Sequence, residues 1–147
     1  MKCKILFLLA FIFLLKQNAL AQREKHVIDS LTKQYNKEQK LENKAAIAGE
    51  LSQVFMSFSL EESEKWGKLA LENAELSRNK SAMVKANNDN GVRLLSNGGK
   101  KENIEKAKQF FETAVSIAEK NKLDKDLSES LINLAKIYRT LTDYDKA

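Results

Sequence analysis

The stretch LINLAKIYRTLTDYDKA, residues 131–147, decides the fold. Its apolar residues recur at the spacing of one helical face. They are Leu131, Leu134, Ala135 and Tyr138. A short polar segment follows, and the sequence reaches Ala147 near the start of an expected second helix. The stretch therefore predicts a helix that ends near residue 141, a turn, and a further helix that begins at about residue 143.

The composition of the whole chain favours the same secondary structure. Of 147 residues, 43% are hydrophobic and 31% are charged, and there is no proline and only 5 glycines. This balance argues for a helical globular protein and against disorder or a sandwich of many short strands. Apolar spacing predicts helices at about 24–37, 40–58, 60–78, 81–97, 103–121 and 126–141.

Three short segments predict where helices begin or end. Ser59 is followed three positions later by Glu62, and Asp126 by Glu129, so each pair can form a capping box that starts a helix. Asn97-Gly98-Gly99 ends a helix, because glycine adopts the left-handed conformation of a C-cap at little cost.

Residues 1–21 have the pattern of a secretory signal peptide. Lys2 and Lys4 form a basic start, an unbroken apolar run extends from Ile5 to Leu15, and small residues end the segment. The run is about half of the 20 apolar residues that a membrane-spanning helix needs. We therefore expect cleavage between Ala21 and Gln22 and a periplasmic or extracellular protein. In the alternative, the protein is held in the membrane, either by the uncleaved segment itself or by an anchor in a missing downstream segment.

The net charge of the chain comes largely from this segment. Of the formal +5, three charges belong to lysines in residues 1–21, which leaves +2 for the remainder. A binding site for nucleic acid needs a clustered basic face. We therefore expect no nucleic-acid partner for this region, and no membrane span within the mature segment.

The residue types that carry most catalytic chemistry are scarce. The single cysteine, Cys3, lies in the signal segment, and the single histidine, His26, lies near the new N-terminus. One histidine without a cysteine cannot build a zinc site of the usual ligand types. Phosphate-binding loops and hydrolase motifs are absent from the sequence. We therefore expect a protein that is not an enzyme and has no catalytic residue, no metal site and no cofactor.

The predicted helices form an internal repeat. Small residues that each precede a large apolar residue by three positions recur at Ser52, Gly91 and Ala135, which are 39 and 44 residues apart. In the helices that follow, the small or apolar positions align as Gly67 with Phe111, Ala70 with Ala114 and Ala74 with Ala118. Such a period is typical of a helical solenoid, in which small residues let the two helices of a pair approach closely.

At these residues the sequence resembles the tetratricopeptide repeat family. The family pattern Trp-x-x-Leu-Gly-x-x-Tyr followed by Ala-x-x-x-Phe is matched by residues 131–138 and by Ala107-x-x-x-Phe111. Among the departures, Asn90 takes the leucine position of the middle repeat and Ser63 an alanine position. The resemblance covers nearly all of residues 40–147.

The resemblance implies an all-α, right-handed superhelical array of antiparallel helix pairs. Residues 22–39 would be a leading helix, and residues 40–147 about two and a half repeats. In that alignment Ala147 is the first position of the family pattern within the second helix of the last pair. We therefore expect the sequence to be an N-terminal fragment, because a solenoid normally ends with a polar capping helix.

Members of this family bind a protein or peptide partner in a concave groove lined by the first helix of each pair. The alignment assigns to the groove Gln53, Met56, Lys85, Asn88, Val92, Leu95, Ile132, Lys136 and Arg139. The basic clamp of chaperone-binding members is absent, since Gly49, Asp89 and Glu129 occupy three of its positions. Two alternatives stay open: the sensory region of a bacterial signalling protein with a downstream kinase or DNA-binding output, and a structural envelope scaffold.

Overall fold

The computed structural model describes residues 22–96 and 100–145, and these residues form helices and turns without a strand. The predicted signal peptide, its cleavage position before Gln22 and the predicted C-cap at residues 97–99 lie outside the described residues. The helices are a leading helix at 22–37, then α2 Leu41–Phe55, α3 Leu60–Ser77, α4 Lys80–Ser96, α5 Lys101–Lys120 and α6 Asp124–Asp145.

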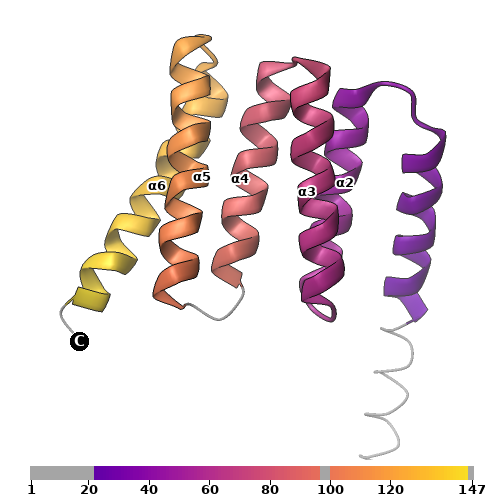
Figure 1. Ribbon diagram of the computed structural model, residues 1–147, viewed down its shortest axis with the longest axis horizontal. Helices are drawn as coiled ribbons and strands as arrows, with labels where there is room; N and C mark the ends of the chain where they lie inside the picture. The colour runs from indigo at the N-terminus through magenta and orange to yellow at the C-terminus, as the bar shows by residue number, and fades with distance from the viewer. Residues whose placement is uncertain (1–21, 97–99, 146–147) are drawn as a thin grey trace, which may run out of the picture.

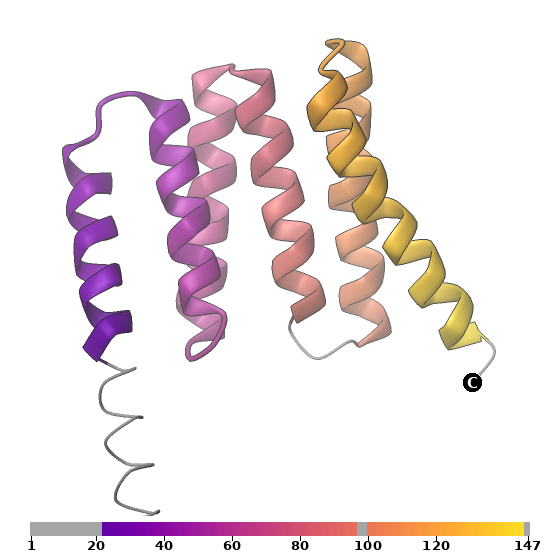
Figure 2. The same ribbon diagram turned by 180° about the vertical axis from the view of Figure 1, so that it is seen from behind.

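The helices stand side by side in two layers. Helices α2, α4 and α6 form one layer, and α3 and α5 form the other, as the two opposite views show (Figure 1, Figure 2). Helix α4 contacts α2, α3, α5 and α6, and each helix runs antiparallel to the next. The predicted all-α solenoid of antiparallel helix pairs is therefore confirmed, with α2–α3 and α4–α5 as its pairs.

Small residues permit these close crossings. Five alanines have no exposed surface, and they lie in α2, α3 and α5: Ala48, Ala70, Ala107, Ala114 and Ala118. At Gly91 a Cβ atom would lie only 2.5 Å from Cε1 of the fully buried Phe111. The predicted role of small residues at the helix crossings is therefore confirmed at these positions.

The start of α3 agrees with the prediction in part. Ser59 is the N-cap, and its hydroxyl accepts a hydrogen bond of 3.3 Å from the backbone N–H of Glu62. The reciprocal half of the capping box is wrong. The carboxylate of Glu62 pairs with Lys65 at 3.3 Å, and the N–H of Ser59 donates instead to the carbonyl of Phe55.

The predicted capping box at Asp126 is wrong, because α6 begins earlier. Lys122 adopts a left-handed φ of 54°, and the N–H of Leu123 donates to the carbonyl of Ala118 over 3.0 Å. This closing turn places Leu123 against buried side chains of α4 and α5. Asp124 then begins α6, and Asp126 lies within its first turn.

The predicted turn between residues 141 and 143 is also wrong, since α6 continues to Asp145. Thr140 and Thr142 donate their hydroxyls to the carbonyls of Lys136 and Tyr138, over 3.0 and 2.9 Å, and so are satisfied within the helix. The segment contains neither glycine nor proline, and its polar residues alone do not end a helix.

The buried face of α6 differs from the predicted stripe. Ser130 and Ile137 have no exposed surface, whereas Leu131 is 46% and Tyr138 49% exposed. Ala135 is exposed as well, although Ser52 and Gly91, its counterparts in α2 and α4, are buried. Among the described residues, Lys108 and Glu112 of α5 contact Tyr138, while Leu131 and Ala135 are exposed.

Candidate functional site

A hollow of about 370 Å³ lies between α4 and α6, the first helices of neighbouring repeats. Lys85 and Asn88 reach it from α4, and Lys125, Asp126 and Glu129 from the first turns of α6. Two of the predicted groove residues therefore meet three charged residues of the next repeat. The hollow belongs to the layer of α2, α4 and α6 that Figure 2 shows in front.

Asn88 is the best-defined polar group of the hollow. Its side chain is 4% exposed, and its amide nitrogen donates a hydrogen bond of 2.9 Å to the hydroxyl of Ser130. Ser130 donates its own proton to the carbonyl of Asp126 over 2.8 Å, so it can only accept from Asn88. This sets the orientation of the amide, with the nitrogen toward Ser130.

The amide oxygen of Asn88 consequently has no hydrogen-bond donor. It is buried. Among the buried side-chain oxygens and nitrogens of the described residues, it is the one atom without a hydrogen-bond partner. A buried acceptor without a donor costs about 1 to 3 kcal/mol. Asn88, which lines the hollow, therefore carries an acceptor that has no donor among the described residues.

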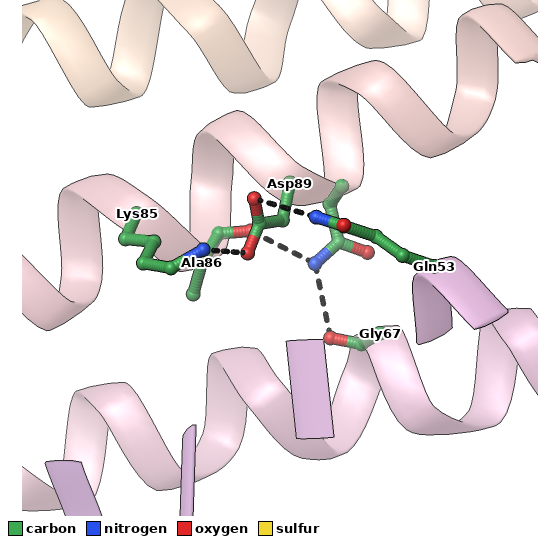
Figure 3. Close-up of polar contacts among 6 residues, drawn as sticks. Gln53, Gly67, Lys85, Ala86 and Asp89 are labelled. Atoms are coloured by element: carbon green, nitrogen blue, oxygen red, sulfur yellow. Dashed lines mark hydrogen bonds and ion pairs between the residues drawn. The ribbon is translucent and has the colours of Figure 1, made fainter. Parts of the chain in front are cut away.

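Asp89 joins two other predicted residues across the α2–α4 crossing. Lys85 forms an ion pair with one carboxylate oxygen at 2.7 Å, and the amide of Gln53 donates to the other over 3.2 Å (Figure 3). The charge of Lys85 is therefore already balanced. A Cβ atom at Gly49 would lie 2.8 Å from this carboxylate, so the glycine leaves space for the bridge.

The remaining predicted residues of the first two repeats line no part of this hollow. Met56 is half-buried in the turn after α2, and Val92 is 37% exposed on α4. Leu95 is half-buried and packs against the apolar cluster around Phe111. These three residues therefore contribute no contact to the hollow.

The predicted residues of α6 lie farther along the helix than the hollow. Ile132 is 58% exposed, and Lys136 and Arg139 are exposed one and two turns later. The ammonium group of Lys136 lies 3.4 Å from the amide oxygen of Asn133. The structure thus places these side chains in solvent on the helix that forms one wall of the hollow.

The sequence alignment did not identify Ser130, which holds Asn88 in place. A signal for it exists, because Ser130, Leu134, Ile137 and Leu141 recur at intervals of four, three and four residues. Leu134, Leu141 and Ile137 all belong to the apolar cluster between α4, α5 and α6. The helix thus has two apolar stripes in its sequence, and the one that contains Leu131 and Tyr138 is the exposed one.

Two other properties concern the described residues only. No group of histidine, cysteine or acidic residues among them could hold a metal ion. None of the helices formed by these residues has the length and apolar character needed to cross a membrane.

A comparison with protein families identifies one repeat within the chain. The model of the tetratricopeptide repeat matches residues 93–121, which comprise the end of α4 and all of α5. Comparison with curated proteins and with solved structures finds no match. Repeats of this family generally mediate protein–protein interaction and are typically non-catalytic. Residues 93–121 are thus identified as a tetratricopeptide repeat, and the antiparallel helix pairs with small residues at their crossings agree with a solenoid of such repeats.

Proposed function

We propose that this protein, without catalysing a reaction, binds an extended polypeptide segment along the face formed by α2, α4 and α6. The observation that carries the proposal is the unsatisfied amide oxygen of Asn88, a residue that lines the hollow between α4 and α6. An extended peptide exposes backbone N–H groups at regular intervals, and one of them can satisfy this oxygen. Repeats of the family generally bind proteins, which supports the same reading.

The charges of the face favour a segment with some acidic character. The ammonium of Lys85 is balanced by Asp89, so it contributes little attraction. Lys136 and Arg139 are exposed, and no ion pair with a carboxylate within 4.0 Å is found for them among the described side chains. We propose that a carboxylate of the partner binds these two residues while its backbone lies over Asn88.

The location that we propose for this interaction is the periplasm or the cell exterior. It rests on residues 1–21, whose basic start, apolar run and small residues are typical of a secretory signal peptide. The domain division that accompanies it is a leading helix at 22–39 and a repeat domain at 40–147.

A second candidate function is a sensory segment or scaffold within a larger assembly. The uncovered face of α6 favours it, because Leu131 and Tyr138 are half exposed where α2 and α4 are covered by the second helix of their pairs. Replacing both residues with serine would abolish assembly through this face and leave peptide binding at Asn88 intact.

The test of the proposed function uses peptides selected on the protein from a random display library. Asn88→Met removes the acceptor, and we expect it to weaken the binding of the selected peptides at least tenfold, which is about 1.4 kcal/mol. The matched control is Asn87→Met, because Asn87 is also buried but donates to the carbonyl of Met83 and does not line the hollow.

Circular dichroism and calorimetric titration complete the experiment. Asn88→Met should remain helical, since the substitution removes a polar group whose oxygen is unsatisfied in the free protein. Equal affinity of the wild type and the Asn88 variant would contradict the proposal. In the wild type, the side-chain amide resonances of Asn88 should shift on peptide addition, which gives a second measurement that does not depend on the variant.

A further inference from the structure

A second hollow, of about 330 Å³, opens on the opposite side of α4. Helices α3 and α5 form its walls, and α4, which contacts both, forms its floor. It therefore lies in the layer of α3 and α5, the helices that Figure 1 shows in front, whereas the hollow at Asn88 lies between α4 and α6. The proposed polypeptide groove uses none of its residues.

Arg93 is the charged residue of the floor. It is only 8% exposed, and its Nε donates a long hydrogen bond of 3.4 Å to the amide oxygen of Asn90. Among the described residues no carboxylate lies within 4.0 Å of its guanidinium, although Glu64 acts on it at longer range. Burial lowers the pKa of Arg93, but a guanidinium remains protonated in proteins. A buried cation without a partner is costly.

The other cations at the hollow have carboxylates of their own. Lys68 pairs with Glu64 at 2.7 Å, and Lys106 pairs with Glu102 at 2.6 Å. The hydrogen bond from Lys68 is the main reason that the pKa of Glu64 lies below its ordinary value, so Glu64 stays ionised and engaged. Arg93 therefore carries the positive charge that lacks a counterpart, and one anionic group would complete the site.

The position of Arg93 is built into the helix crossing. The amide nitrogen of Asn90 donates to the carbonyls of Gly67 and Ala86, over 3.0 and 2.9 Å, and both bonds are drawn in Figure 3. At Gly67 a Cβ atom would lie 2.6 Å from the amide oxygen of Asn90 and 3.1 Å from Nε of Arg93. The glycine thus leaves the space in which Asn90 holds the guanidinium.

Apolar side chains form the rest of the hollow beside this charge. Leu94 is almost fully buried, and Leu71 and Phe110 are half-buried on the two walls. We propose that the hollow binds a small monocarboxylate with an apolar body. The guanidinium donates two hydrogen bonds to the two carboxylate oxygens as a bidentate pair, and Leu71 and Phe110 contact the apolar part. The volume lies at the lower end of the range of small-molecule sites.

The experiment uses the full chain and three probes: phenylacetate, its neutral amide phenylacetamide, and inorganic phosphate. Phenylacetate should shift the Nε–H resonance of Arg93 and the methyl resonances of Leu71 and Leu94 in a saturable manner. The neutral amide should bind at least tenfold more weakly, because it cannot balance the charge. Phosphate should also bind more weakly, because it makes no use of the apolar walls.

Two variants assign the binding to the guanidinium. Arg93→Met should fold, since replacing a buried charge with an apolar side chain is often neutral or stabilising, and it should lose the binding of phenylacetate. Arg93→Lys keeps the charge without the planar fork and should weaken the binding at least fivefold. The control is Lys120→Met, which removes an exposed cation at the end of α5 away from the hollow.

Three results would overturn the proposal. They are equal binding of phenylacetate and phenylacetamide, equal binding of phenylacetate by the wild type and Arg93→Met, and no shift of the Arg93 resonance at millimolar phenylacetate. Phosphate binding as tight as that of phenylacetate would overturn the part of the proposal that concerns the apolar body. The wild-type titration decides the question even if a variant fails to fold.

Discussion

Ser52 and Ser63 exchange hydrogen bonds across the crossing of α2 and α3. The hydroxyl of Ser52 donates to the carbonyl of Ser63 over 2.7 Å, and the hydroxyl of Ser63 donates to the carbonyl of Ser52 over 2.8 Å. Both residues are buried, and their side chains fill the place where the family pattern has small apolar residues. Ser63 departs from the family pattern, and the result is a pair of buried hydrogen bonds within the first helix pair, which we call the Ser52–Ser63 clasp.

This exchange predicts a stability effect of two conservative substitutions. Ser52→Ala and Ser63→Ala should each lower the free energy of unfolding by about 1 kcal/mol, because each removes one buried hydrogen bond. Urea unfolding measures the change. The control is Ser128→Ala, whose exposed hydroxyl bonds to Asp124 within α6 and should matter by less than about 0.5 kcal/mol. Equal effects at buried and exposed serines would contradict the role of the clasp.

Gly91 and Gly49 should respond differently to alanine. At Gly91 the new Cβ atom would meet the ring of Phe111, which is fully buried and cannot move aside, so Gly91→Ala should destabilise by about 1 to 3 kcal/mol. At Gly49 the neighbour is the carboxylate end of Asp89, which is partly exposed and can shift. Gly49→Ala should therefore be close to neutral, because alanine favours the helix by about 1 kcal/mol. Thermal melts of both variants would show the contrast, and similar melting temperatures would refute it.

The stability of the start of α2 should depend on the ionisation of Glu38. Its carboxylate accepts hydrogen bonds from the N–H groups of Lys40 and Gln39 and from the side chain of Asn43, and these bonds lower the pKa of Glu38, the one from Lys40 most. The bonds favour the ionised form in the folded state. Their contribution to stability is therefore present above the pKa of the unfolded chain and is lost as the pH falls through the lower pKa of the folded protein.

The measurement for Glu38 is a comparison with Glu38→Gln over a range of pH. The wild type should be the more stable protein at pH 7, and the difference should shrink as the wild-type carboxyl group becomes protonated. A carboxyl titration by nuclear magnetic resonance gives the pKa directly. An ordinary glutamate pKa, or a difference in stability that does not change with pH, would exclude this role.

Lys136 and Arg139 test the α6 end of the proposed groove. Replacing both with alanine should leave the helical circular dichroism signal intact, because both side chains are exposed. It should weaken an acidic selected peptide by about 1 to 3 kcal/mol if the two residues make charge-assisted hydrogen bonds. Titration calorimetry measures the change. Unchanged affinity would place the contact elsewhere and remove these two residues from the groove.

Export predicts a defined N-terminus. The mature protein should begin at Gln22 or at its cyclised form, because small residues precede this position after the apolar run. N-terminal sequencing of the protein from the exporting cell determines this. A mature chain that retains Lys2 would show that the segment is not removed.

Local signals in the sequence predicted most helices and the repeat. The apolar spacing at about 103–121 predicted α5, and Ser59 predicted the start of α3, because both signals act within one or two turns of the chain. The limits of α6 were predicted less well. Its start depends on how Leu123 packs against α4 and α5, and this contact joins residues far apart in the sequence.

The sequence by itself determined that this protein is a solenoid of helix pairs, because small residues recur at the period of a repeat and a close helix crossing needs them. Only the tertiary structure decided which polar groups lack partners. Asn88 was among the predicted groove residues, but its unsatisfied oxygen follows from the bond that Ser130 makes on another helix. Arg93 had no signal at all, because its isolation depends on where the carboxylates of α3 and α5 lie. Whether a buried polar group has a hydrogen-bond partner depends on the residues that surround it in three dimensions, and a sequence pattern does not specify those residues.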